Sequence, residues 1–594
     1  MSEVDCSPLQ AGDLERALKA LDDGAEFKAT LEELLLRLPA ERGERLMLCM
    51  REGRGAYLPL LSTRSGRALL CGNALSGTAA ALGRCDLELT VVDESPERLR
   101  FAEHRDRQWC FGKTRFVQLE GDRLPFEDGD FDLVVSEPAV APFGDGREVA
   151  SSELLRVGRG EWVRHAENRL AYKRSTGKRG EFAKASLGGF LRGVRADREH
   201  PIGARGFTSR LEREARELAQ VPTWTNYALY PHQNDFSHVV ACDSEGPALT
   251  VGPKERQNRA KLAAQRAGLF PWLAPSLLAV GRTTAAPTRL DGLLETVAGA
   301  LGVPTPRPAV LVATRGNTAV VHTDADAGEG WTLHLPLSAH QTTQARQHFA
   351  RLQQLRRAHS ECPVPDPLWE GEWCGAYVCV ERRLDGWTAP QLTGNLAAAE
   401  RTYATVATAL AQLSVEAPRP LDDADLDELF TAKVRLVQRF CAHDALAAEL
   451  NERLERARDL AAGERVPRVV YHSDLRAKHV QVTPEGDLLG LLDWGSSRDA
   501  DLPYFDLLNL IVHDRKQQAG RSLGWAWGLA LEEKLRDYER RALAAYADTL
   551  GLSRSYCEAI ETLYPALVGA MAESNWDYSR PRWLARTLDR LQGS

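Results

Sequence analysis

The chain has 594 residues, of which 43% are hydrophobic and 27% charged, and its formal net charge is −8. This length exceeds what one hydrophobic core serves and favours about three or four domains. The composition is that of a globular protein. The negative charge argues against a general nucleic-acid binder, because it would repel phosphate polymers.

The first residues, MSEVDCSPLQAGDLERALKALDD, place acids where a secretory signal carries a basic stretch followed by an apolar one. We therefore expect a cytoplasmic protein, with residues 1–60 forming an N-terminal helical extension. The 11 cysteines are scattered without paired zinc spacing, so reduced thiols are expected. The longest apolar run, Leu269 to Val280, is too short to span a membrane, which predicts no integral membrane segment.

Residues 61–245 have the pattern of a doubly wound α/β domain. From Arg67 onward a short apolar strand, a small-residue turn, a helix and a second strand ending in an acid follow one another. Ligands of such sheets bind at the carboxyl ends of the strands. Asp93, in VVDESP, stands where a carboxylate can accept both ribose hydroxyls of a nucleoside cofactor.

Together with GDRLPFEDGDFDLVVS, these motifs resemble class I S-adenosylmethionine-dependent methyltransferases, whose fold is Rossmann-like. The resemblance implies S-adenosylmethionine (SAM) as cofactor, with Gly72 and Gly77 in its loop and Asp122 near the adenine. The loop lacks the acid that would meet the cofactor's amino group, so weak binding is as plausible as normal binding. A NAD-binding domain is the weaker alternative, because the tight GxGxxG is missing.

Three histidines of this domain are of interest. His165 and His232 are candidate proton acceptors for a hydroxyl about to be methylated. The passage ALYPHQNDFSHVVA, which includes Tyr230, His232 and His238, is expected to form the closing strand pair of the same domain.

A polar stretch rich in Gly and Pro follows, and residues 246–304 are expected to form a helical linker. PAVLVATRGNTAVVHT then predicts two strands joined by a tight turn that contains Arg315. GWTLHLPLS predicts a third strand, QARQHFARLQQLRRAH a helix, and GAYVCVERRLDG a strand that leads into a hinge at Glu381.

The stretch VVYHSDLRAKHVQV, followed after a short turn by GLLDWG, carries the chemistry of the C-terminal half. Phosphoryl transfer requires a carboxylate that orients the attacking hydroxyl and further groups that hold magnesium on the phosphates. Asp474 and Asp493 fit these two roles.

These residues resemble the aminoglycoside phosphotransferase and choline kinase family. Its signature is a His-x-Asp loop, an Asn five residues after the Asp, and an Asp-Trp pair near twenty residues on; here the matching residues are His472 and Asp474, His479 in place of Asn, and Asp493 with Trp494. FDLL, with Asp506, resembles the family's downstream helix.

The resemblance implies an α+β fold of two lobes, like that of protein kinases, with residues 305–390 as the small lobe and 391–594 as the large lobe. It also implies ATP and Mg²⁺. Asp474 would be the catalytic base in the His472 loop, Asp493 the principal metal ligand, and His479 a second ligand, although magnesium prefers oxygen.

In that family a lysine of the small lobe contacts the nucleotide phosphates and pairs with a helix glutamate. His334 stands at the matching place, and no lysine occurs between Lys261 and Lys433. Phosphate neutralisation is therefore expected from Arg315, with His334 as a weaker donor.

The motifs together predict a bifunctional transferase, which phosphorylates a hydroxyl of a sugar, glycan or other small molecule and methylates a related acceptor. Two alternatives remain open. One is a kinase whose degenerate methyltransferase domain recruits the acceptor, and the other is a non-catalytic scaffold. The sequence indicates no partner protein.

Overall fold

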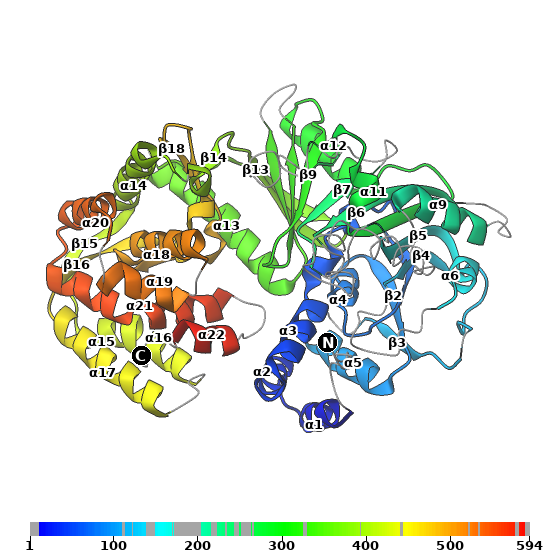
Figure 1. Ribbon diagram of the computed structural model, residues 1–594, viewed down its shortest axis with the longest axis horizontal. Coiled ribbons are helices and arrows are strands. Elements are labelled where there is room, and N and C mark those ends of the chain that lie inside the picture. Colours follow the sequence, from blue (N-terminus) through cyan, green and yellow to red (C-terminus); the bar gives the residue numbers. More distant parts are fainter. Residues whose placement is uncertain are drawn as a thin grey trace, which may run out of the picture. The chain divides into compact units, whose positions relative to one another are not determined.

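A computed structural model describes the fold (Figure 1). It describes residues 11–109, 113–121, 123–137, 149–168, 170, 203–215, 222–231, 235–242, 249–250, 263, 266–324, 330–360, 362–392, 394–439, 444–520, 523–532, 535–575 and 581–588. The chain divides into two compact units, Met1–Thr342 with Leu368–Val380, and Thr343–Pro367 with Glu381–Ser594.

The first unit begins with helices in the region predicted as a helical extension. Its helices are α1 (Ala11–Asp22), α2 (Phe27–Arg37), α3 (Ala40–Met50), α4 (Gly77–Gly83), α5 (Pro96–Trp109), α6 (Ser151–Val157), α9 (Gly203–Glu214), α11 (Phe270–Leu273) and α12 (Arg289–Leu301). Two 3₁₀ turns, η1 (Glu52–Gly55) and η2 (Leu58–Leu60), follow α3 and are buried. Charged and glycine residues in η1 are thus enclosed by the fold, which requires polar partners for them.

One sheet runs through the first unit. Its strands are β1 (Gly66–Cys71), β2 (Leu87–Asp93), β3 (Arg115–Gln118), β4 (Phe131–Ser136), β5 (Gly158–Glu167), β6 (Thr223–Tyr230), β7 (His238–Ala241), β8 (Ser276–Arg282), β9 (Pro308–Ala313), β10 (Thr318–Thr323), β11 (Trp331–Pro336), β12 (Pro367–Trp373) and β13 (Ala376–Arg382). Their order is β12-β13-β11-β10-β9-β7-β6-β8-β5-β4-β1-β2-β3.

The sheet has two parts of different character. Five neighbouring strands, in the order β5-β4-β1-β2-β3, pair in parallel, as expected for a doubly wound domain. The predicted hairpins also form, since β6 pairs with β7 and β9 with β10, all antiparallel. Strand β7 pairs with β9 through His238 and Val239, so the two parts make one continuous sheet (Figure 1).

Strand β8 differs from the sequence-based expectation, which placed residues 246–304 in a helical linker. It lies between β5 and β6 and is antiparallel to both. Leu277 to Val280 are fully buried. The sequence of a strand that is covered on both faces is a continuous apolar run. Such a run lacks the hydrophobic periodicity that would distinguish a strand from a buried helix.

The second unit is mostly helical around two small sheets, β14-β17-β18 and β15-β16-β19. Its helices are α13 (Ala339–Ala358, from residue 343), α14 (Leu396–Ala411), α15 (Asp423–Leu426), α16 (Ala432–Gln438), α17 (Asp444–Ala461), α18 (Phe505–Ala519), α19 (Leu523–Glu532), α20 (Asp537–Leu550), α21 (Arg554–Asn575) and α22 (Pro581–Leu588). Its strands are β14 (Trp387–Thr388), β15 (Ser414–Pro420), β16 (Arg465–Tyr471), β17 (Val480–Val482), β18 (Leu488–Leu491) and β19 (Arg498–Asp501).

The core of this unit surrounds the loops that follow β16 and β18. Trp494, Phe505 and Tyr564 are among its largest fully buried side chains. Large buried aromatic rings fix the loops beside them, because each ring makes many close contacts. Among the described residues, no helix is both long and apolar enough to cross a membrane.

Candidate active site

Side chains of α18 hold the loop after β16 by hydrogen bonds. Both carboxylate oxygens of Asp506 accept backbone N–H groups of this loop, from His472 at 2.7 Å and from Ser473 at 2.9 Å. Asn509, one helical turn further, donates from Nδ2 to the carbonyl of Leu475 at 3.1 Å. Ser473 has a φ of 68°, a left-handed conformation that costs energy and persists only where the surroundings enforce it. The loop is therefore rigidly presented.

His472 joins this loop to the strand end that carries Asp493. Its Nε2 donates to the carbonyl of Leu492 at 2.9 Å, and its ring lies 4.6 Å from the ring of Trp494, centroid to centroid. Burial lowers the pKa of this imidazole, which keeps it neutral. His472 is thus a positioning residue for the two loops.

Asp474, His479 and Asp493 converge at one point. Their ligand atoms all lie within 4.8 Å of one another. His479 Nδ1 donates to the backbone carbonyl of Asp474 at 2.8 Å, which turns Nε2 towards Asp493, whose Oδ2 is 3.2 Å away. Asp493 has a φ of 66°, so its backbone turns sharply at the end of β18 and presents the carboxylate to His479.

This cluster fits a divalent cation. His479 is buried, and its Nε2 has no hydrogen-bond partner among the described residues. Burial, with Lys478 nearby, lowers the pKa of His479 to about 3, so the imidazole is neutral and its lone pair is available. The Asp493 side chain is 60% exposed, and the positive charge of Lys478 nearby lowers the pKa of its carboxyl. A neutral imidazole beside carboxylates is a metal-ligand set.

Arg476 lies beside the candidate base. Its Nε donates to Asp474 Oδ1 at 2.6 Å, and its Nη2 contacts the same oxygen. Asp474 Oδ2 takes no part in that ion pair. The guanidinium thus fixes the orientation of the carboxylate and leaves one oxygen for a substrate hydroxyl.

His348 on α13 has no counterpart in the sequence motif, in which a glutamate is expected on this helix. Its Nδ1 accepts the backbone N–H of Trp494 at 3.0 Å, and its Nε2 donates to Glu381 at 2.8 Å. Both side chains are buried. Glu381, expected at a hinge, therefore forms a buried pair that holds α13 against the residue after Asp493. The sequence signal was a histidine on the apolar face of a predicted helix.

Comparison with family models gives two matches. Residues 311–548 match the model described as the phosphotransferase enzyme family, and residues 69–161 match the model described as a methyltransferase domain. The chain joins a methyltransferase domain to a phosphotransferase domain. This confirms the predicted fusion and its transferase class.

Solved structures of phosphotransferases are similar to part of the chain. Aminoglycoside phosphotransferase APH(3'')-Id from Streptomyces rimosus, in complex with ADP and streptomycin, is 17% identical with a TM-score of 0.28, and the match covers 42% of this chain and 90% of that one. Macrolide 2'-phosphotransferase MphH from Brachybacterium faecium is 18% identical with a TM-score of 0.35, covering 50% and 98%. A comparison with curated proteins gave no match.

The methyltransferase match implies SAM, and Asp93 is the residue expected to bind its ribose. Its two oxygens instead accept N–H groups of the protein, from Ala74 at 2.8 Å, Ser95 at 2.9 Å and Arg98 Nε at 2.9 and 3.0 Å. The Asp93 side chain is 0% exposed. The Arg98 guanidinium therefore occupies the Asp93 carboxylate that would otherwise accept the ribose hydroxyls.

The loop between Gly72 and Gly77 is also enclosed. Arg105, itself buried, donates to the carbonyls of Ala74, Leu75 and Ser76 at 2.9 to 3.2 Å. A Cβ on Gly72 would lie 2.8 Å from the carbonyl oxygen of Glu137, and one on Gly77 would lie 2.0 Å from that of Arg51. At both glycines the space that a cofactor would need is therefore occupied by backbone atoms of the protein. As arranged, these residues do not fit SAM.

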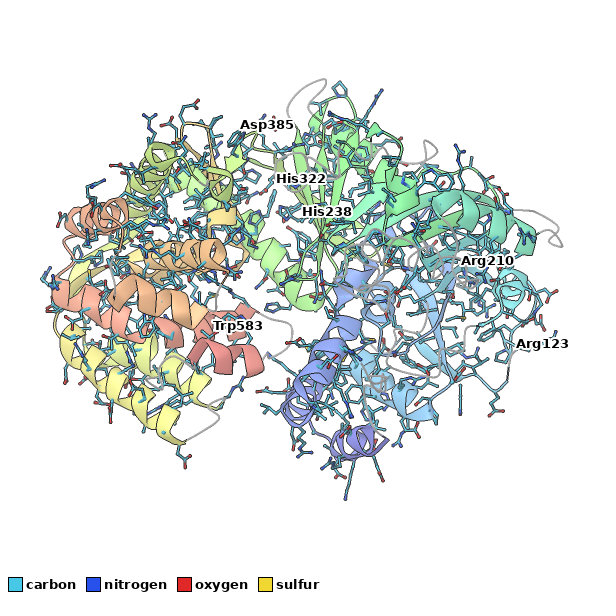
Figure 2. All side chains as sticks on the ribbon, viewed as in Figure 1. Arg123, Arg210, His238, His322, Asp385 and Trp583 are labelled. Carbon is cyan, nitrogen blue, oxygen red and sulfur yellow. The ribbon has the colours of Figure 1, made fainter. Side chains whose placement is uncertain are left out.

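The remaining candidates lie in the first unit or outside the described residues. Arg315 is exposed on the β9–β10 turn, and His334 lies partly buried on β11. His238 begins β7 and lies on the same sheet as His322 of β10 (Figure 2). Asp122 and His232 fall outside the described residues. His165 is buried on β5, and burial lowers its pKa to about 4.

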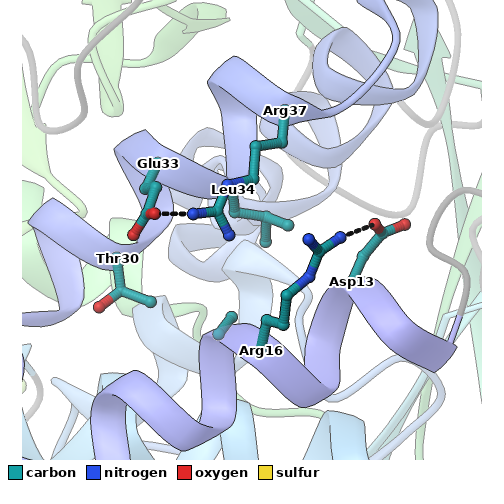
Figure 3. Close-up of a pocket in the computed structure, with 7 residues that line it drawn as sticks. Asp13, Arg16, Thr30, Glu33, Leu34 and Arg37 are labelled. Carbon is teal, nitrogen blue, oxygen red and sulfur yellow. Dashed lines mark hydrogen bonds and ion pairs between the residues drawn. The ribbon is translucent and has the colours of Figure 1, made fainter.

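A small pocket between α1 and α2 carries no catalytic group. It is lined by Asp13, Arg16, Ala17, Thr30, Glu33, Leu34 and Arg37 (Figure 3). Its charges are paired within each helix, Arg16 with Asp13 and Arg37 with Glu33. Such pairs at helical spacing are ordinary surface ion pairs.

Proposed function

We propose that the chain transfers the γ-phosphoryl group of ATP to a hydroxyl of a small-molecule or glycan acceptor, at the site formed by Asp474, His479 and Asp493. The convergence of their ligand atoms within 4.8 Å supports this proposal most directly. The family match of residues 311–548 agrees with it. The acceptor oxygen forms a bond to phosphorus, the bond to the β-phosphate oxygen breaks, and the hydroxyl proton passes to Asp474.

The residues divide the work. Asp474, oriented by Arg476, accepts a hydrogen bond from the acceptor hydroxyl and aims its oxygen at the phosphorus. Asp493 and His479 would hold Mg²⁺, which neutralises phosphate charge when bound. His472 and Asp506 keep the two loops in register through their hydrogen bonds.

The nucleotide phosphates require further positive charge, because the small lobe has no lysine. We assign this role to Arg315, which is exposed on the turn between β9 and β10, with His334 as a weaker donor. Both residues belong to the stretch predicted as the small lobe, Arg315 on the β9–β10 turn and His334 on β11.

The methyltransferase domain is not assigned methyl transfer. Asp93 is occupied by protein donors and residues 73–77 are buried, so the arrangement favours a chain with one catalytic site. This agrees with the kinase-only alternative derived from the sequence.

The test is transfer from labelled ATP with magnesium to a panel of sugars, glycolipids and other hydroxylated small molecules, using the full chain. Asp474→Asn is the matched control, since it keeps size and hydrogen bonding but removes the charge. Label in an acceptor with the native chain, and none with Asp474→Asn, supports the proposal. Equal incorporation by both would refute the role of Asp474.

A further inference from the structure

The turn between β9 and β10 is fastened to the segment Arg51–Gly53 near the N-terminus. Asn317, the last residue of the turn, accepts the backbone N–H of Gly53 at 3.1 Å through Oδ1 and donates to Glu52 Oε2 at 2.8 Å through Nδ2. One amide thus makes two bonds to a segment 264 and 265 residues away in sequence. The bond to the carboxylate is charge-assisted, which makes it the stronger of the two.

Arg51 reaches the other end of the same turn. Its Nη2 donates to the carbonyl of Thr314 at 2.7 Å, while its Nη1 pairs with Asp235 at 2.6 Å. The turn that carries Arg315 is therefore held at both of its ends, Thr314 and Asn317, by consecutive residues of one short segment.

This fastening is enclosed and geometrically demanding. Glu52 is 1% exposed and Asn317 is 3% exposed, so their polar groups depend on one another. Asn317 has a φ of 55°, the left-handed conformation that asparagine tolerates better than most residues. A buried carboxylate and a left-handed asparagine persist when the surrounding structure fixes them.

The same segment closes the loop of the methyltransferase domain. The carbonyl of Arg51 approaches Gly77 so closely that a Cβ there would lie 2.0 Å from it. Next to it, Arg54 lies 3.4 Å from Glu137, which accepts a hydrogen bond from Ser76. Residues Arg51–Arg54 therefore contact both the Gly72–Gly77 loop and the β9–β10 turn.

We propose that the segment Arg51–Gly53 clamps the β9–β10 turn through Arg51, Glu52 and Asn317, and thereby presents Arg315 as a contact for nucleotide phosphates. The proposal rests on the proposed function, because it takes this turn as the nucleotide contact. It gives the methyltransferase domain, which packs against Arg51, a role that needs no cofactor. Arg51, Glu52 and Asn317 act through Arg315 and are positioning residues.

The experiment compares Mg·ADP binding by calorimetry in the full chain and in Asn317→Gly. Glycine removes both side-chain bonds but retains access to positive φ, so the turn is released without backbone strain. The expected result is an affinity about tenfold weaker and faster amide hydrogen exchange at residues 314–317. KM for ATP should rise by a similar factor, with a smaller change in kcat.

Two further variants make the outcome decisive. Glu52→Gln keeps the shape but removes the charge, and a loss of affinity smaller than that of Asn317→Gly is expected. Thr323→Val is the matched control, since it deletes a buried acceptor for the Trp331 N–H at the far end of β10 and should leave nucleotide affinity unchanged.

The possible results are distinct. Unchanged affinity and exchange in Asn317→Gly and Glu52→Gln would overturn the clamp while leaving phosphotransfer intact. If the native chain itself did not bind Mg·ADP, the proposed function would fail, and the clamp with it. Should Asn317→Gly fail to fold, Glu52→Gln decides alone.

Discussion

His479 and Asp493 come from separate turns, yet Nε2 of one lies 3.2 Å from Oδ2 of the other. The backbone carbonyl of His479 also accepts the N–H of Leu492 at 2.8 Å, so the two turns are tied by backbone as well as by side chains. The imidazole has no freedom to turn away, because Nδ1 is bound to the carbonyl of Asp474. A preformed ligand pair of this kind lowers the cost of binding a cation.

Asp474→Asn should lower kcat by about 10²- to 10⁴-fold, since general base assistance is worth about that much. The fold should persist, because the amide keeps the shape of the carboxylate. Steady-state kinetics with an identified acceptor, together with a thermal melt, measures both. A variant with native kcat would show that another group orients the hydroxyl.

His479→Asn should change the choice of metal. Nitrogen ligands favour Mn²⁺ over Mg²⁺ more than amide oxygens do. The ratio of Mn²⁺ to Mg²⁺ affinity, measured by calorimetry with ADP present, should therefore fall in the variant. An unchanged ratio would mean that His479 does not contact the ion.

Asp506 should make stability depend on pH. Burial raises its pKa to about 7, against the two backbone hydrogen bonds that lower it, so the folded chain holds this proton more tightly than the unfolded chain. Its contribution is complete below the unfolded-state pKa of about 3.9 and is lost as the pH rises through about 7. Denaturant midpoints of the native chain and Asp506→Asn should diverge across this range, and parallel curves would contradict the shift.

His348→Ala should destabilise the second unit. The change removes the 2.8 Å hydrogen bond to buried Glu381 and the acceptor of the Trp494 N–H, and each lost bond costs about 1 to 3 kcal/mol. The double variant His348→Leu, Glu381→Leu should recover part of this loss, because it replaces the buried polar pair by apolar side chains. Urea denaturation of the three chains gives the comparison. A double variant less stable than His348→Ala would argue against the lost hydrogen bond to Glu381 as the cause.

Titration of the full chain with SAM should give no binding heat. Arg98→Ala removes the guanidinium from Asp93 but leaves Arg105 on the loop carbonyls, so this variant should also show no binding heat. Micromolar affinity in the native chain would show that these arginines move aside for the cofactor.

The sequence predicted what depends on local motifs. The strand-turn-strand around Arg315 and the hairpin whose second strand begins at His238 were both expected, and both form. The loop with His472 and Asp474 and the strand end at Asp493 were also expected to act together, and they converge. Each of these follows from residue types at fixed short spacing.

Long-range pairings were not accessible in this way. Strand β8 was hidden in an apolar run without period, and His348 was overlooked because its two partners come from distant segments. The hydrogen bond of Asn317 to Glu52 joins residues more than 260 positions apart, and the local sequence around either residue does not predict this pairing. Only tertiary structure brings such groups together.

The pairing of β7 with β9 has a practical consequence for dividing the chain. A truncated protein that began near residue 305 would expose the backbone of β9 along an open sheet edge, and unpaired edges recruit strands from other molecules. Such a fragment should aggregate, whereas a cut that leaves both strands in one piece should not. The chain should therefore not be divided at residue 305, where the sequence predicts that the small lobe begins.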